Sequence, residues 1–242
     1  MLGRDENEAR LAFCLDLLDK TSDFAIAVKP NEQYLFGFTY EDHKTLVNEA
    51  HRNGLLCILD CKLGDIADTS ESKLYWVRRT GYDAITVHTQ QGNLQQIVRE
   101  AHLNTPKIGI FALVLMSNQE AVKYFKTSKI DDEPVYVSVA RDVKAFEADG
   151  CVVGATGHVT EQEIQTIVKN AGKDKAFLVP GLGTQRGDPQ KVFRAGVENV
   201  LFNVGRNIIY SEDPASKARE YSAMLNALSA DHNWEAMNNE HK

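Results

Sequence analysis

The feature that most constrains the fold of this chain is a regular alternation between short apolar runs and longer amphipathic stretches. Seven apolar runs are rich in branched or aromatic residues: 24–29, 55–60, 83–88, 107–116, 150–155, 176–181 and 199–205. Their lack of polar alternation indicates strands covered on both faces, as in a parallel sheet. The stretches between them predict helices over 41–53, 69–81, 93–102, 137–150, 160–172, 188–196 and 213–230.

Local signals mark the ends of three of these helices. Gly81 is a C-cap candidate, because glycine readily adopts the left-handed conformation found there. Thr160 and Glu163 form a capping-box pattern. Asp188 is followed by a proline, which suits an N-cap before the first helical position.

The alternation predicts an α/β fold, either a (β/α)8 TIM-type barrel or an open doubly wound sheet. No Gly-x-Gly-x-x-Gly opens a helix, which disfavours a dinucleotide-binding fold. Only seven strands are visible, because residues 5–22 indicate a helix where a first strand would lie. A strand over 10–17 is the alternative, but it leaves no room for a helix before residue 24. We therefore expect a barrel lacking its first β-strand, a single domain over 1–230, and a tail over 231–242.

The composition of the chain argues against nucleic acid, a membrane or a metal ion as a binding partner. The 242 residues are 43% hydrophobic and 25% charged, with a formal net charge of −7 and no lysine- or arginine-rich run, so we expect no nucleic-acid surface. The longest apolar stretch is too short to span a membrane, and the polar N-terminus does not resemble a signal peptide. The four cysteines form no Cys-x-x-Cys pair, which favours reduced core residues in a cytoplasmic protein over a metal site.

A dense group of charges follows the second apolar run, in the stretch "CILDCKLGDIADTS" over 57–70. Asp60 and Lys62 are two residues apart on a strand, so they face the same side, and Asp65 lies just past them. An ion pair closing the strand end is one interpretation. With Lys29 at the end of the preceding strand, the alternative is an alternating-charge array of Lys29, Asp60, Lys62 and Asp65. Such an array would hold an ammonium group where negative charge develops on a substrate.

The last two strand ends show a different pattern. The segment "PGLGTQRGD" after 176–181 has glycines that let backbone N–H groups approach an anion, and Gly205 and Arg206 close the final strand. Gly-Arg alone fits a solvated loop equally well. Because phosphates often bind at the last two strand ends of a barrel, we favour a phosphate site.

Five ordered segments of this sequence resemble the orotidine 5′-monophosphate decarboxylase family. "DCKLGDIADT" is similar to its Asp-x-Lys-x-x-Asp signature, and the other four segments are "FAIAVKPN", "LVLMS", "LVPGLGTQRGD" and "VGRNIIYSEDP". Sugar-phosphate relatives share the signature, whereas the Met-Ser and Pro-Gly…Gln segments favour the pyrimidine-nucleotide enzyme. The resemblance extends over about residues 13–221.

The resemblance implies a specific site and reaction, cofactor-free decarboxylation of orotidine 5′-monophosphate to UMP in pyrimidine biosynthesis. Lys62 would protonate the pyrimidine carbon, Asp60 would lie beside the substrate carboxylate, and Lys29 would bridge Asp60 and the ribose. Asp65, also catalytic, and Thr69 would reach across a homodimer interface into the neighbouring site. The other implied substrate-binding residues are Ser117 and Gln185 for the pyrimidine and lid, Gly205 and Arg206 for the phosphate, and Pro180. No metal is expected, and a phosphoribosyltransferase is a possible partner.

The sequence departs from the family at its start, where the first strand and its ribose-contacting aspartate are missing. We expect either a truncated form with reduced stability and activity, or a chain whose first strand is encoded upstream of Met1. Two other functions stay open: a magnesium-dependent sugar-phosphate enzyme, which needs a carboxylate where this chain has Lys29, and a non-catalytic nucleotide-phosphate binder.

Overall fold

A computed structural model describes residues 2–239 of the chain, with side chains described for 6–66 and 68–231. The chain forms two compact units that divide within strand β4, the first ending at Leu113 and the second beginning at Val114. None of the helices in the described part of the chain is both long and apolar enough to cross a membrane.

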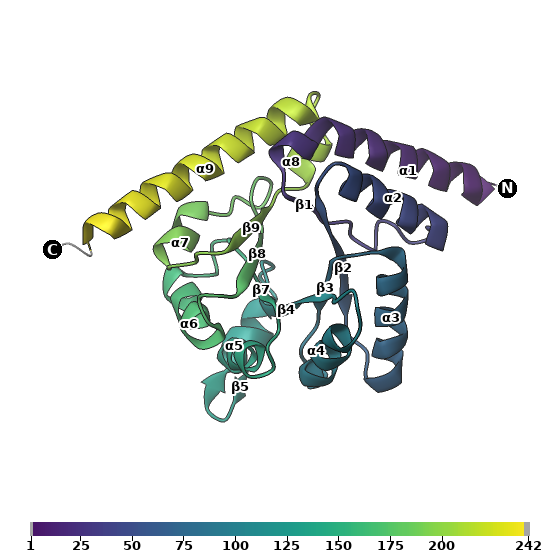
Figure 1. Cartoon of the computed structure of the whole chain (residues 1–242). Coiled ribbons are helices and arrows are strands. Elements are labelled where there is room, and N and C mark those ends of the chain that lie inside the picture. The colour runs from purple at the N-terminus through teal and green to yellow at the C-terminus, as the bar shows by residue number, and fades with distance from the viewer. Residues whose placement is uncertain (1, 240–242) are drawn as a thin grey trace. The chain divides into compact units, whose positions relative to one another are not determined.

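The first unit is built from parallel strands joined by helices. Its elements are α1 (Leu2–Thr21), a 3-10 turn (Ser22–Phe24), β1 (Ala27–Val28), α2 (Tyr40–Arg52), β2 (Leu56–Leu63), α3 (Ala67–Thr80), β3 (Ala84–Val87), α4 (Leu94–Leu103) and the start of β4 (Gly109–Leu115). Strands β1 to β4 pair in chain order, and α2 and α3 flank β1 and β2 (Figure 1). The N-terminal helix is confirmed, and the alternative strand over 10–17 is wrong. No strand among the described residues precedes β1.

The second unit continues the same alternation. Its elements are a π-helix (Val122–Thr127), β5 (Lys129–Ile130), β6 (Glu133–Pro134), α5 (Val135–Ala145), β7 (Gly150–Val153), α6 (Glu161–Ala171), β8 (Ala176–Pro180), α7 (Pro189–Arg194), β9 (Val200–Asn203), α8 (Arg206–Ile209) and α9 (Pro214–Asn239). Strands β7, β8 and β9 are parallel, whereas β5 and β6 form a small antiparallel hairpin that the sequence patterns do not predict. Helix α9 packs against α7 and α8.

The predicted strands all form, and the helix-end signals are confirmed. Gly81 caps α3 with φ 92°, and Thr160 forms a capping box with Glu163 at the start of α6. The Asp188 side chain accepts a 2.9 Å hydrogen bond from the Gln190 N–H at the start of α7. Helix α9 differs from prediction, since it continues to Asn239 instead of ending near residue 230. The single domain over 1–230 stays a prediction.

Continuous apolar strands give each unit a buried core. In the first unit Cys57, Ile85 and Ile110 lie on β2, β3 and β4 and are fully buried. In the second unit Leu115, Cys151 and Phe177 are buried in the same way. The buried parts of these strands are mostly apolar, and the candidate site residues lie toward or just beyond the C-terminal ends of the strands.

Candidate active site

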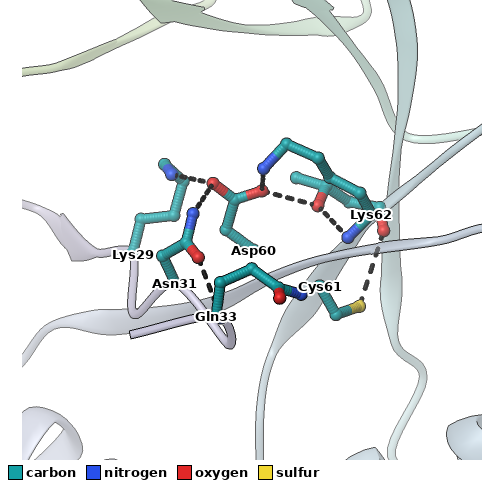
Figure 2. A network of polar contacts seen from close by, with 7 residues as sticks. Lys29, Asn31, Gln33, Asp60, Cys61 and Lys62 are labelled. Carbon is teal, nitrogen blue, oxygen red and sulfur yellow. Dashed lines mark hydrogen bonds and ion pairs between the residues drawn. The ribbon is translucent and has the colours of Figure 1, made fainter. Parts of the chain in front are cut away.

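Three charged residues of the first unit meet at the ends of β1 and β2. Lys29 follows β1, and β2 carries Asp60 and Lys62 on one face because strand side chains alternate. Figure 2 shows Lys29 and Lys62 reaching Asp60 from opposite sides, while Cys61 points away from them. The structure therefore brings Lys29, Asp60 and Lys62 together, as the predicted charge array requires.

The Asp60 carboxylate is the centre of this network. Its Oδ2 contacts the Lys29 ammonium and accepts from the Asn31 amide at 3.2 Å. Its Oδ1 accepts from Lys62 Nζ at 2.8 Å and from the Thr86 hydroxyl at 2.9 Å. Asp60 is only 7% exposed, so these four donors replace the water that a carboxylate otherwise requires. We refer to Lys29, Asn31, Asp60, Lys62 and Thr86 as the Asp60 network.

The protonation of Asp60 follows from its surroundings. Burial favours the neutral acid, but the Lys29 and Lys62 ammonium groups outweigh it and hold the pKa of Asp60 at about 2. Burial lowers the pKa of Lys29 against the opposing effect of Asp60, so the Lys29 shift favours a neutral pair whereas the Asp60 shift favours a charged one. We take the pair as charged, because Asp60 faces two ammonium groups and two further donors.

Lys62 has an unusual backbone. Its φ is 46°, in the left-handed region that an L-residue adopts at a cost of about 1–2 kcal/mol. The register between β2 and β3 shifts between Leu59 and Leu63, so the sheet ladder is interrupted at Lys62. The Lys62 N–H donates instead to the Thr86 hydroxyl at 2.9 Å. Strained backbone of this kind is concentrated at functional sites.

A cavity of about 520 Å³ lies beside the end of β2 and is lined in part by Lys62, Asp65 and Thr69. Its volume is in the range of small-molecule sites. The side chains of Asp65 and Thr69 are exposed, and no contact joins Asp65 to Lys62 among the described residues. The Asp65 carbonyl accepts from Ser70 Oγ and Asn93 Nδ2, which fixes its backbone. Within one chain, therefore, Asp65 stands outside the Asp60 network, and its predicted place in the charge array is wrong for a single chain.

In the second unit, Ser117 lies close to the end of β7. The Ser117 carbonyl accepts from the Thr156 hydroxyl at 2.8 Å. A Cβ at Gly154 would lie 2.6 Å from Ser117 Cα, so only glycine permits this approach. The backbone of the half-buried Ser117 is thus held by a buried threonine and a required glycine.

The loop after β8 is tied to the turn after β9. Thr184 Oγ1 donates to Asn207 Oδ1 at 2.6 Å, and Asn207 Nδ2 donates to the Tyr221 hydroxyl of α9 at 2.9 Å. A Cβ at Gly183 would lie 2.8 Å from Asn207 Cγ, so a glycine at this position lets the loop after β8 approach the Asn207 side chain. Asn207 therefore connects the glycine-rich loop to the Gly205–Arg206 turn.

The predicted ligand residues of this unit occupy that loop and turn. Pro180 ends β8, Gln185 is exposed in the loop, and Gly205 precedes α8. Arg206 is exposed, and its guanidinium has no partner among the residues that the structure describes. An exposed arginine beside backbone N–H groups is a suitable anion-binding arrangement. That these residues share one site with the Asp60 network stays a prediction.

Sequence reasoning missed four residues of these arrangements: Asn31, Thr86, Asn207 and Tyr221. Thr86 had a detectable signal, since it is the polar residue inside the otherwise apolar run 84–87. Asn31 and Asn207 each lie within two residues of a predicted site residue. Tyr221 had no signal, because its contact with Asn207 depends on how α9 packs.

The strand order, the Asp60 network and the glycine-bearing loop define an α/β protein of the (β/α)-barrel class, with seven parallel strands in its described part and charged groups at the strand ends. Residues 9–221 match the family described as "Orotidine 5'-phosphate decarboxylase / HUMPS family". The chain belongs to this family.

Individual relatives agree with that assignment. An orotidine 5′-phosphate decarboxylase from Thermomicrobium roseum is 31% identical over 234 residues, which cover 89% of this chain and 79% of the relative. The structure of Leishmania donovani OMP decarboxylase has a TM-score of 0.78 at 24% identity, covering 92% of this chain and 89% of that one. Leishmania donovani UMP synthase has a TM-score of 0.77 at 27% identity, and the match covers 92% of this chain but 51% of that protein.

Proposed function

We propose that this protein decarboxylates orotidine 5′-monophosphate to UMP and carbon dioxide in pyrimidine biosynthesis. One observation carries the proposal: the Lys62 ammonium is held 2.8 Å from a buried Asp60 carboxylate that Lys29 also contacts. A relative that is 31% identical to this chain carries the name orotidine 5′-phosphate decarboxylase. Its name favours this reaction over the sugar-phosphate and non-catalytic alternatives.

The reaction requires a proton donor beside a developing carbanion. The bond between the ring carbon and the carboxylate breaks, carbon dioxide leaves, and the electron pair stays on the ring carbon. Lys62 Nζ gives its proton to that carbon, and the resulting amine regains a proton from water. Because the ammonium is fixed before the reaction, it stabilises the developing charge without reorganisation. No cofactor enters this balance of atoms and electrons.

Asp60 and Lys29 hold this donor in place. In the proposal Asp60 lies next to the substrate carboxylate, and Lys29 bridges Asp60 and the ribose. The low pKa of Asp60, about 2, keeps it charged at neutral pH, so it retains both lysines. Lys29 also occupies the place where a magnesium-dependent sugar-phosphate enzyme needs a carboxylate ligand.

The second unit is proposed to bind the rest of the nucleotide. Arg206 and the Gly205 amide would hold the phosphate, Ser117 and Gln185 would contact the pyrimidine and the closed loop, and Pro180 would also line the substrate site. The exposed guanidinium of Arg206 and the Thr184–Asn207 hydrogen bond support this role. Binding energy from a distant phosphate can position the reacting carbon and close the loop.

Asp65 and Thr69 are proposed to enter the site of a second copy, making a cytoplasmic homodimer with shared sites. Both side chains are exposed at the cavity that Lys62 also lines, and nearby Ile66 and Trp76 are exposed apolar residues, 59% and 52% respectively. Such apolar surface beside polar groups suits an interface. The UMP synthase likeness, which covers about half of that protein, is compatible with a transferase partner.

Mixing two inactive variants tests the shared site. Lys62→Ala and Asp65→Ala chains should each be inactive as homodimers. Each mixed dimer contains one site with both residues intact, so an equilibrated equal mixture should regain roughly a quarter of wild-type activity. Dimers that exchange chains without regaining activity would contradict the shared site.

Turnover is the direct test of the proposed reaction. Purified protein mixed with orotidine 5′-monophosphate should show the ultraviolet absorbance change that accompanies loss of the carboxylate, and a chelator should leave the rate unchanged. Loss of activity with chelator would favour the sugar-phosphate type of chemistry. UMP binding without any turnover would favour the non-catalytic binder.

A further inference from the structure

One buried hydroxyl touches both partners of the Lys62–Asp60 pair. Thr86 lies on β3 and is 1% exposed. Its Oγ1 donates to Asp60 Oδ1 at 2.9 Å and accepts from the Lys62 backbone N–H, also at 2.9 Å. A hydroxyl has one proton and two lone pairs, so both bonds form at once.

The Lys62 backbone depends on that hydroxyl. Lys62 has φ 46°, and the shift in register between Leu59 and Leu63 removes the regular ladder partner from its N–H. The ladder resumes directly afterwards, where the His88 N–H donates to the Leu63 carbonyl at 2.8 Å. Thr86 therefore supplies the acceptor at the point of interruption, where an unpaired buried N–H would otherwise disfavour this backbone.

We propose that Thr86 is a positioning residue for the decarboxylation, fixing the Lys62 backbone and the Asp60 carboxylate in one geometry. Its effect on turnover rests on the proposed function. The hydroxyl touches neither ammonium group, so it acts through Asp60 and the Lys62 main chain. Valine at this position would fill nearly the same space but would offer neither hydrogen bond.

Within the described residues of the first unit, two charged groups and two neutral donors face the Asp60 carboxylate. The charged groups that face its carboxylate are Lys29 Nζ and Lys62 Nζ, and the neutral donors are Asn31 and Thr86. Removing a donor to the ionised form disfavours that form. Loss of the Thr86 hydroxyl therefore raises the pKa of Asp60, whereas a simple packing defect elsewhere does not.

The experiment compares Thr86→Val and Thr86→Ser with Thr80→Val. Thr80 is a matched control, since it is 8% exposed and its hydroxyl donates only to main-chain carbonyls within α3. Thr86→Val should lower kcat by about ten- to hundredfold with a smaller change in KM, because a hydrogen bond to a charged group is lost. Thr86→Ser should stay within about threefold of wild type, and Thr80→Val should leave kcat unchanged.

A second measurement does not depend on turnover. Carbon-13 NMR titration of the Asp60 carboxyl should give a higher pKa in Thr86→Val than in wild type, and an unchanged pKa in Thr80→Val. Where Thr86→Val does not fold, Thr86→Ala against Thr86→Ser gives the same comparison, since only the alanine lacks the hydroxyl. Equal kcat and equal Asp60 pKa with and without the hydroxyl overturn the inference. Absence of turnover in wild type refutes the proposed function instead, and the titration still decides the role of Thr86.

Discussion

Replacing Asp60 by asparagine removes the charge at the centre of the Asp60 network while conserving its shape. Asp60 has a pKa of about 2 in the folded protein, against an ordinary value of 3.8. That difference corresponds to about 2.5 kcal/mol of stability at neutral pH, since one pKa unit is worth about 1.4 kcal/mol. Asparagine also leaves the Lys29 ammonium, whose side chain is 12% exposed, without its carboxylate. Breaking a buried pair in this way costs about 3–5 kcal/mol, so we expect a loss of this size at pH 7.

The pH dependence of that loss has a definite sign. The folded pKa is depressed, so the stabilisation is complete above the unfolded value of 3.8 and disappears as the pH falls through about 2. About half of the stabilisation by ionised Asp60 should be lost at pH 3. The free energies of unfolding of wild type and Asp60→Asn, measured by urea titration from pH 7 to pH 3, should therefore approach each other in acid.

An exposed ion pair provides the control for this measurement. Asp16 pairs with Lys20 on α1, and its side chain is 55% exposed. Asp16→Asn should change stability by less than about 0.5 kcal/mol at every pH, because exposed pairs are screened by solvent. If Asp60→Asn destabilises the protein no more than Asp16→Asn, or if its loss is independent of pH, the reasoning about the Asp60 network is refuted.

Two further predictions concern the second unit. Arg206→Ala should weaken UMP binding by about ten- to hundredfold in calorimetry, because a charge-assisted contact with phosphate is lost; Arg194→Ala, an exposed arginine paired with Glu161, should bind normally, and equal losses would reject the phosphate role. Gly154→Ala should cost about 1–3 kcal/mol in urea unfolding and weaken nucleotide binding, because its Cβ would lie 2.6 Å from Ser117 Cα. Gly157→Ala meets no atom within 4 Å and should be nearly neutral, so similar effects of the two alanines would contradict the account.

Much of the fold was predictable because it depends on local patterns. Continuous apolar runs such as 109–115 favour strands buried on both faces, and all the predicted strands form. The contact of Asp60 with Lys62 follows from the two-residue period of a strand, and its contact with Lys29 from the parallel pairing of β1 with β2. The first prediction rests on the period of a single strand, and the second requires only that consecutive strands pair in chain order.

The details that tune the site were not predictable in this way. The left-handed backbone of Lys62 and the Thr86 hydroxyl bonds arise from a shift in register between β2 and β3, which sequence patterns do not encode. The link from Asn207 to Tyr221 depends on the packing of α9, a helix that also continues beyond its predicted end. In each case tertiary contacts decide between conformations that local propensity leaves equally open.

Turnover by Lys62→Ala, measured together with UMP binding, is the most direct test of Lys62 as the proton donor. The account predicts that kcat falls by at least about a thousandfold, because the proton donor is removed, while the dissociation constant for UMP changes by less than about tenfold. Lys73→Ala is the matched control, since Lys73 lines the same cavity but pairs with Glu32 instead of Asp60, and it should retain wild-type turnover. A Lys62→Ala protein that keeps more than about a tenth of wild-type turnover would contradict the assignment of Lys62 as the proton donor.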